Sequence, residues 1–182
     1  MALLSRGVRK FALTAHICSS VGWLGAIAGF LAIAVTGLLT QDGQIVRAAY
    51  LGMDWIGWYV LVPISFASLL TGLIQSLGTE WGLFRHYWVV AKLLINVLAN
   101  VVLLLYMLEL SSVVAMLPSH DAGGLKSASP VLHASVALGL LLVATILAVY
   151  KPRGITPYGW RRHQELRRKA WEQRQHSLAV EQ

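Results

Sequence analysis

The chain has 182 residues, of which 57% are hydrophobic and 13% are charged, and its mean hydropathy is +0.63. Soluble domains carry about 25% charged residues, so a chain this poor in charge cannot cover a water-facing globule. The composition excludes a soluble cytosolic enzyme, a disordered tail and a secreted disulfide scaffold. The single cysteine, Cys18, cannot form an intramolecular bridge.

Four long apolar runs follow one another along the chain. A helix needs about 20 apolar residues to cross a bilayer, and only helices or closed barrels satisfy their backbone groups there. The runs lack the alternation of barrel strands. We therefore predict an all-α fold, a four-helix transmembrane bundle within residues 1–154. The predicted helices cover about residues 11–39, 55–77, 87–117 and 131–150, and residues 41–54 are expected to form a connection with at most an interfacial turn of helix.

Lysine and arginine gather at one end of the predicted bundle. They precede the first helix, occur as Arg85 in the second connection and follow the fourth helix, whereas the first and third connections hold only Arg47 and Lys126. Cytoplasmic loops carry an excess of basic residues. Both termini are therefore predicted to be cytoplasmic, with the bundle in the inner (plasma) membrane.

Residues 155–182 form a basic tail. Trp160 and Trp171 are about three helical turns apart and share a face among arginines. We expect a short amphipathic helix that lies on anionic lipid headgroups. Membrane topology already explains the net charge of +7, so nucleic-acid binding is not predicted.

The first apolar run contains polar residues that lipid disfavours. His16, Ser20 and Trp23 are spaced i, i+4 and i+7, which places them on one helical face. Ionisable side chains inside a membrane helix usually face the bundle interior. This face is therefore expected to point inward.

A strip of glycines lies beside that face. Gly25 and Gly29 have the GxxxG spacing that allows close helix approach, and Gly22 precedes them. We interpret the strip as a packing surface, and as the source of space for a flat cofactor between helices.

The third apolar run carries Lys92, Asn96 and Asn100 at i, i+4 and i+8. A lysine at the centre of a membrane helix costs about 2.5–3.5 kcal/mol on insertion scales. Two interpretations stay open: Lys92 reaches back to the headgroups, or the stripe is a buried polar seam. His16 is predicted to lie about 8 Å inside the cytoplasmic boundary of the membrane. Lys92 is predicted at a similar depth from the same boundary, so the two are expected to share a pocket.

A second polar cluster is predicted near the outer boundary. It contains His133, Met107, Met53 and Asp54. Its simplest explanation is a polar rim among interfacial aromatic residues. Its thioethers and imidazole would also suit copper.

A neutral imidazole inside a bilayer ligates haem iron or copper. For haem b, His16 would be the axial ligand and Lys92 a partner of a propionate or a weak second ligand, with Trp23 and Asn96 on the same inward faces. For metal ions the candidate ligands are His16, His133 and Met107. The sequence contains no CxxC, CxxCH, HExxH or Gly-rich phosphate motif.

Three segments resemble a bacterial family of uncharacterised four-helix integral membrane proteins. They are residues 14–25 (TAHICSSVGWLG), residues 77–94 (LGTEWGLFRHYWVVAKLL) and residues 150–154 (YKPRG). This resemblance extends to about Gly159 and implies architecture without an assigned activity.

A fainter likeness is to the HemJ-type membrane protoporphyrinogen oxidase and to the membrane domain of copper resistance protein D. His16 with Trp23 and Gly25, and Lys92 after Trp88, look similar to those families. In the oxidase family the corresponding histidine and lysine are implicated in haem b binding, so the resemblance implies that role for His16 and Lys92.

The sequence thus predicts an integral membrane protein that binds haem b, as a redox protein or as a subunit of a membrane redox complex. The alternative is a non-enzymatic membrane protein, either a copper or small-solute transporter or an accessory subunit. A third possibility is a homo-oligomer in which the polar residues serve only helix packing. Whether the protein is an enzyme is left open.

Overall fold

The computed structural model describes residues 5–78, 83–117, 124, 126–150 and 154–180, except for the side chains of residues 163 and 176–180. Within these residues the structure is almost entirely helical, and the one strand-like pairing is an isolated antiparallel bridge between His86 and Ile155. Residues 79–82 and 151–153, which belong to the family resemblance, lie outside this description.

The described chain confirms the predicted four-helix class. Each of the four long bundle helices is long and apolar enough to cross a bilayer, which is the property of a multi-pass membrane protein. The bundle consists of α1 (Arg6–Leu39), a continuous helix built from α2 (Gly43–Ile56), η1 (Gly57–Leu61) and α3 (Val62–Gly78), then α4 (Tyr87–Ala115) and α5 (Ser129–Tyr150).

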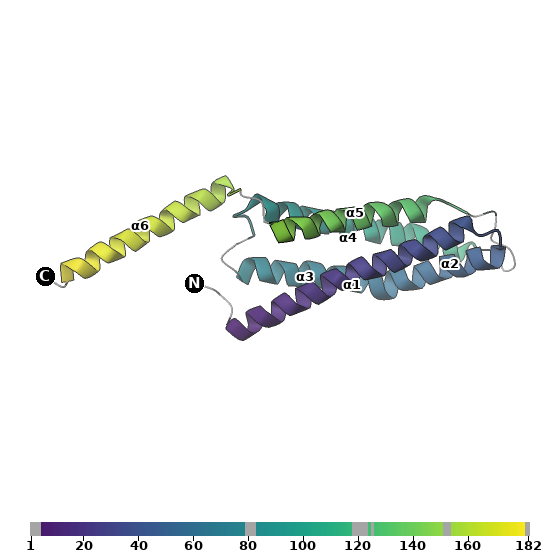
Figure 1. Cartoon of the computed structure of the whole chain (residues 1–182), viewed down its shortest axis with the longest axis horizontal. Coiled ribbons are helices and arrows are strands. Elements are labelled where there is room, and N and C mark those ends of the chain that lie inside the picture. The colour runs from purple at the N-terminus through teal and green to yellow at the C-terminus, as the bar shows by residue number, and fades with distance from the viewer. Residues whose placement is uncertain (1–4, 79–82, 118–123, 125, 151–153, 181–182) are drawn as a thin grey trace.

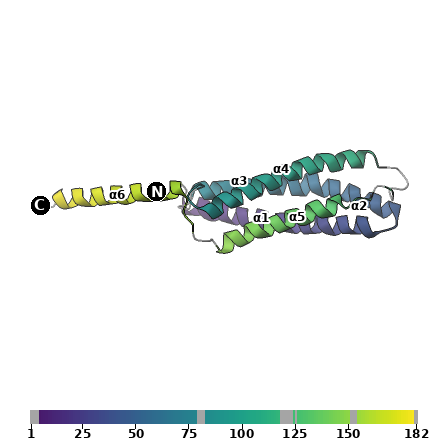
Figure 2. The same cartoon turned by 90° about the horizontal axis from the view of Figure 1, so that it is seen from above.

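The four long helices run side by side along one axis (Figure 1, Figure 2). Both α1 and α4 pack against α3 and α5, so α1 and α4 occupy opposite corners of the bundle. We call the end where α1 and α4 begin and α3 and α5 end the basic end, and the opposite end the distal end. A further helix, α6 (Pro157–Val180), leaves the bundle at the basic end (Figure 1).

The second helix begins about a dozen residues earlier than the sequence predicted, because the segment expected as a connection is the helix α2. The Asp42 side chain accepts a hydrogen bond from the backbone N–H of Gln44 at 2.8 Å and caps this helix. Val46, Tyr50 and Met53 are almost completely buried at helical spacing. Arg47 and Asp54 interrupt the apolar run, which is why length and hydropathy alone placed the start too late.

The turn between α2 and α3 is a wide, π-type turn. Pro63 has no N–H, so the carbonyl of Tyr59 loses its helical donor, and the proline ring would clash with that carbonyl. A widened turn over Gly57–Leu61 relieves this conflict. Met107 of α4 packs onto Gly57, where an added Cβ would overlap the thioether. The glycine therefore lets α4 approach the wide turn closely.

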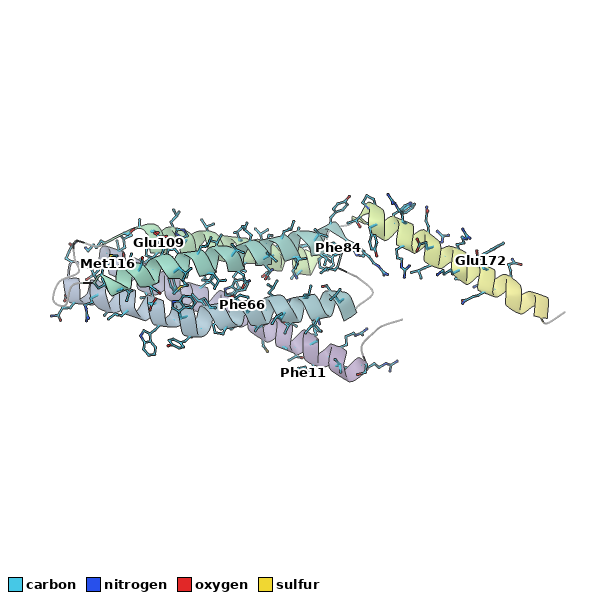
Figure 3. All side chains as sticks on the ribbon, turned by 180° about the vertical axis from the view of Figure 1, so that it is seen from behind. Phe11, Phe66, Phe84, Glu109, Met116 and Glu172 are labelled. Atoms are coloured by element: carbon cyan, nitrogen blue, oxygen red, sulfur yellow. The ribbon has the colours of Figure 1, made fainter. Side chains whose placement is uncertain are left out.

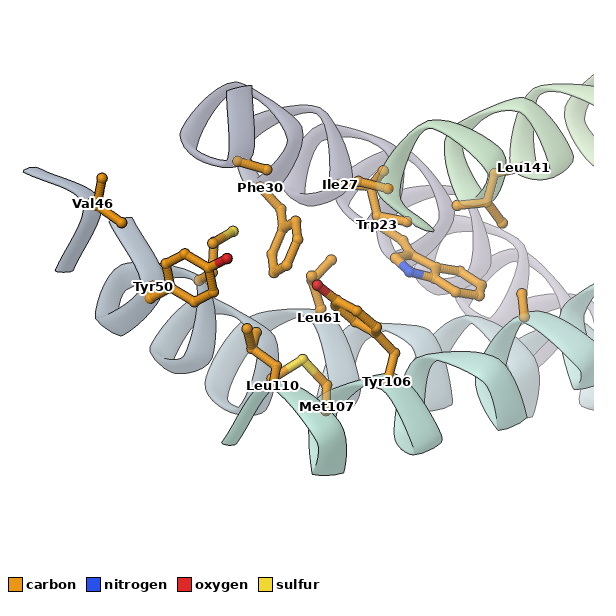
Figure 4. Close-up of a cluster of buried hydrophobic side chains, with 14 residues drawn as sticks. Trp23, Ile27, Phe30, Val46, Tyr50, Leu61, Tyr106, Met107, Leu110 and Leu141 are labelled. Atoms are coloured by element: carbon orange, nitrogen blue, oxygen red, sulfur yellow. The ribbon is translucent and has the colours of Figure 1, made fainter. Parts of the chain in front are cut away.

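Large buried side chains fill the distal half of the bundle (Figure 4). Phe30 meets Tyr106 edge to face, with ring centroids 6.5 Å apart and the ring planes at 73°. Met107 and Leu61 pack in the same cluster and are at most 2% exposed. This half is closely packed.

The outer surface of the bundle is apolar, and side chains project from it along its length (Figure 3). On α4, Leu94, Leu98, Leu105 and Leu108 are each more than half exposed. A large exposed apolar face marks a surface that contacts a membrane or another protein, and the length and hydropathy of these helices favour a membrane. Burial of apolar surface against lipid thus replaces the large core that a soluble domain of this length would need.

The glycines of α1 differ in what surrounds them. A Cβ at Gly37 would lie 2.9 Å from the Cβ of Ala49 in α2, whereas a Cβ at Gly25 or Gly29 would meet nothing within 4 Å. Gly22 contacts Ile64 of α3. The predicted packing role therefore holds within this chain for Gly22, while Gly25 and Gly29 face outward.

We predict opposite effects of alanine at two α1 glycines. Gly37→Ala should lower stability by about 1–3 kcal/mol because Ala49 cannot move without a backbone shift. Gly29→Ala should be neutral or stabilising, because alanine exceeds glycine in helix propensity by about 1 kcal/mol. Thermal unfolding in detergent measures both. Equal midpoints for the two variants would contradict the close contact of α1 with α2.

Candidate functional site: a cavity at the basic end

The imidazole of His16 is held by α3. Its Nδ1 atom lies 3.1 Å from the carbonyl oxygen of Ser68 and 3.2 Å from the hydroxyl of Thr71. A carbonyl oxygen only accepts, and the Thr71 hydroxyl already donates to a backbone carbonyl of its own helix. Nδ1 therefore carries a proton and donates it. The lone pair of the neutral ring is then on Nε2.

Gly72 makes room for this ring. A Cβ at Gly72 would lie 2.9 Å from Cε1 of His16, so the imidazole rests directly on the α3 backbone. The sequence interpretation that the α1 glycines provide space for a cofactor is wrong, since Gly22, Gly25 and Gly29 are not among the residues that line the cavity described below. The space comes from the facing helix instead.

The contact between α1 and α3 continues as a polar seam. The hydroxyls of Ser20 and Ser68 are 2.9 Å apart. Ser19 donates to the carbonyl of His16 at 3.1 Å and approaches Thr71 at 3.4 Å. Hydrogen bonds of this kind join membrane helices where lipid offers no other partner. The seam fixes the rotation of α1 against α3, and with it the position of His16.

The predicted polar stripe on α4 divides into two parts. Asn100 is buried, donates to the carbonyl of Asn96 at 2.8 Å and accepts from the hydroxyl of Ser65 at 2.8 Å. Asn96 donates to the carbonyl of Lys92 at 2.9 Å. Asn100 thus ties α4 to α3, while Lys92 and Asn96 lie on the wall of a cavity.

The ammonium group of Lys92 turns toward the basic end. Its Nζ atom lies 6.0 Å from the ring centroid of Trp88, one turn nearer the start of α4. Both sequence interpretations of the stripe therefore apply in part. Lys92 reaches back along its helix toward the membrane boundary, whereas Asn96 and Asn100 continue into the interior of the bundle.

A cavity of about 790 Å³ lies between α1, α3, α4 and α5 in the basic half of the bundle. All four residues predicted for cofactor binding line it: His16, Trp23, Lys92 and Asn96. Trp23 is 2% exposed, and its indole N–H is buried without a hydrogen-bond partner among the described residues. The side chain of Arg9 also lines this cavity.

Sequence reasoning did not single out the α3 residues of this site. Ser68, Thr71 and Gly72 all touch or face His16. Ser65, Ser68 and Thr71 recur every third residue in the first part of α3, where the other residues from 62 to 74 are apolar. That spacing was the available signal for a polar face.

The outer cluster has a different character. The ring of His133 stacks on Tyr106, with centroids 4.4 Å apart, and its Nδ1 lies 2.9 Å from the carbonyl of Ser129. Met107 is fully buried against Gly57. His133 and Met107 thus have packing partners of their own in the distal half, whereas His16 lines the cavity at the basic end.

Asp54 of the outer cluster belongs to a short hydrogen-bonded chain. Asp54 accepts from the hydroxyl of Ser111, which accepts from the indole N–H of Trp58 at 2.8 Å. No group of three or more His, Cys, Asp or Glu side chains arranged to hold a metal ion occurs in the part of the chain that the structure describes.

Comparisons with protein-family models, with curated proteins and with solved structures found no match to this chain. The resemblances drawn from the sequence therefore remain predictions, and the case for function depends on the geometry of the cavity.

The Ser65–Asn100 hydrogen bond should couple α3 to α4 measurably. We predict that Ser65→Ala and Asn100→Ala each destabilise the protein, and that the double variant shows a coupling energy of about 0.6 kcal/mol, the average for membrane helices. Chemical unfolding in mixed micelles measures this cycle. The control combines Asn100→Ala with Thr36→Ala, whose hydroxyl bonds within α1 to Ala32, and this pair should be additive. A coupling energy of zero for Ser65 and Asn100 would contradict the contact.

Proposed function

We propose that this protein binds haem b in the basic-end cavity, with Nε2 of His16 as the axial ligand. The observation that carries the proposal is the orientation of His16, whose Nδ1–H is bound to the Ser68 carbonyl. Histidines that ligate metals characteristically donate their other ring N–H to a carbonyl or carboxylate, which fixes the tautomer and raises the basicity of the ligating nitrogen. Here that arrangement occurs in the wall of a cavity.

The residues around the cavity suit the other parts of the cofactor. Binding sites for ligands of this size enclose about 300–1,000 Å³, and the observed 790 Å³ falls in that range. Leu24, Leu69 and Leu141 supply apolar wall. Lys92 and Arg9 provide positive charge for two propionates. The buried indole N–H of Trp23 is a donor still in need of an acceptor.

Bound haem would supply one-electron redox chemistry. This chain would supply the site: Ser68 and Thr71 would orient His16, Lys92 would hold a carboxylate near the basic end, and Leu24, Leu69 and Leu141 would form an apolar wall for the macrocycle. The sequence prediction of a redox protein, or of a subunit of a membrane redox complex, follows from this chemistry.

We further propose that the basic end faces the cytoplasm, with the protein in the inner (plasma) membrane. The excess of arginine and lysine at that end supports this orientation. In a Cys18→Ser background, a cysteine introduced at Gln44 should react with an impermeant maleimide added outside the cell. A cysteine at Gln175 should react only after the membrane is opened. Labelling of both positions from the same side would contradict the topology.

The visible spectrum of the purified protein tests haem binding. After expression with ample haem, we expect a Soret band in the wild-type protein and its loss in His16→Ala, because the iron then has no imidazole ligand. His133→Ala is the matched control, since its ring lies in the distal half, and should keep the band. Absence of the band from a folded wild-type protein would overturn the proposal.

The alternative copper site at His133 has a separate test. Equal copper content in wild type and His133→Ala would exclude that site.

A further inference from the structure

The helix α6 is not used by the bundle or by the cavity. It spans Pro157–Val180 and extends away from the basic end, roughly along the long axis of the bundle (Figure 1, Figure 2). At about 1.5 Å per residue it is about 36 Å long. Every described side chain from Trp160 to Gln175 is exposed. The described side chains of this stretch of α6 therefore do not pack into the core of the bundle.

The root of α6 is fixed to the bundle. The backbone N–H of Thr156 donates to the carbonyl of Arg85 at 2.9 Å, and the Thr156 hydroxyl donates to the carbonyl of Phe84. The same hydroxyl accepts from the N–H of Gly159 at 3.1 Å and so caps α6. A Cβ at Gly159 would lie 2.5 Å from the carbonyl oxygen of Arg85. The start of α6 therefore has a set direction relative to the segment that leads into α4.

The acidic residues of α6 are confined to one side of its axis. Its two acidic residues pair with its own arginines, Glu165 with Arg162 at 3.0 Å and Glu172 with Arg168 at 2.8 Å. The hydrogen bond from Arg168 to Glu172 raises the pKa of the Arg168 guanidinium. The basic residues of the helix are Arg161, Arg162, Arg167, Arg168, Lys169 and Arg174.

One face of α6 combines aromatic and basic residues without acids. Trp160, Arg167 and Trp171 lie within about 40° of one another around the axis. Glu165 and Glu172 lie about 120–140° from Trp160. Trp160 and Trp171 are 58% and 63% exposed. We call Trp160, Arg167 and Trp171 the Trp/Arg face.

This face is poorly suited to a lipid surface. A helix that lies in the membrane interface needs a continuous apolar face, but Leu166 lies about 120° from Trp160 around the axis. The direction of α6 also carries it away from the end of the bundle where headgroups would lie (Figure 1). For the whole length of α6 to lie on headgroups, its direction at the Thr156–Gly159 root would have to change.

We propose that the Trp/Arg face of α6 docks an acidic protein surface on the side of the membrane that the basic end faces. Tryptophan and arginine are the residues most enriched at the energetic centres of protein interfaces. Complementary charge brings partners together and sets specificity. This inference does not depend on the cofactor in the cavity.

Site-specific photo-crosslinking in the cells that make this protein naturally tests the proposal. A benzoylphenylalanine replaces Gln164, about 40° from Trp160, or Lys169 on the opposite face. We expect one protein adduct from position 164 and at least about tenfold less from position 169, because hot-spot contacts are confined to a small central patch. The adduct at position 164 should fall to a similar extent in a Trp160→Ala, Trp171→Ala background.

A binding measurement with the purified crosslinked protein then distinguishes a specific partner from a protein that is merely nearby. The crosslinked protein is purified and titrated onto the full-length protein in nanodiscs of zwitterionic lipid, at two salt concentrations. Arg167→Gln should weaken binding about tenfold, and more salt should weaken it further. Lys169→Gln removes the same charge from the other face and should change binding less than about twofold.

Three outcomes would overturn the proposal. The first is an adduct with phospholipid alone, which would favour the headgroup contact expected from the sequence. The second is equal crosslinking from both faces or none from either. The third is a protein adduct whose binding is the same for Arg167→Gln and Lys169→Gln. Circular dichroism of each variant verifies that α6 remains helical.

Discussion

The hydrogen bond from Nδ1 of His16 to the carbonyl of Ser68 is the contact on which the candidate site depends. Lipid tails offer no hydrogen-bond partner to a polar side chain, so a histidine in a membrane helix forms its hydrogen bonds with a neighbouring helix. The bond sets the rotation of α1 against α3 and leaves Nε2 as the ring atom with a lone pair. Gly72 permits the close approach that the bond requires.

The two halves of the bundle differ in how completely side chains fill the space between the helices. In the distal half, Phe30, Tyr106 and Met107 fill the space between helices, and the wide turn at Gly57 admits Met107. In the basic half, Ser20, Gly72 and Ala144 are too small to do so, and a cavity results. The cavity lies where α1, α3 and α5 contribute these small residues beside larger ones such as Trp23 and Leu141.

Most buried polar groups of the described chain have a structural explanation. The buried Asn100 and Ser65 satisfy each other, and hydrogen bonds also join the half-buried Asp54, Ser111 and Trp58. The indole N–H of Trp23 does not fit this pattern, because it is buried beside the cavity without a partner among the described residues. Buried donors without acceptors are uncommon, which directs attention to a ligand at that position.

The sequence by itself determined the four apolar spans, the all-α class and the inward face of α1, because helix length and the cost of burying polar groups in lipid are local properties. It also placed His16 and Lys92 at matching heights on parallel helices, and both line the cavity. Only the tertiary structure decided that α3 seats His16, that Gly25 and Gly29 face outward, and that α2 begins at Gly43. These depend on which helix faces which, and a periodicity within one helix carries no information about its neighbour.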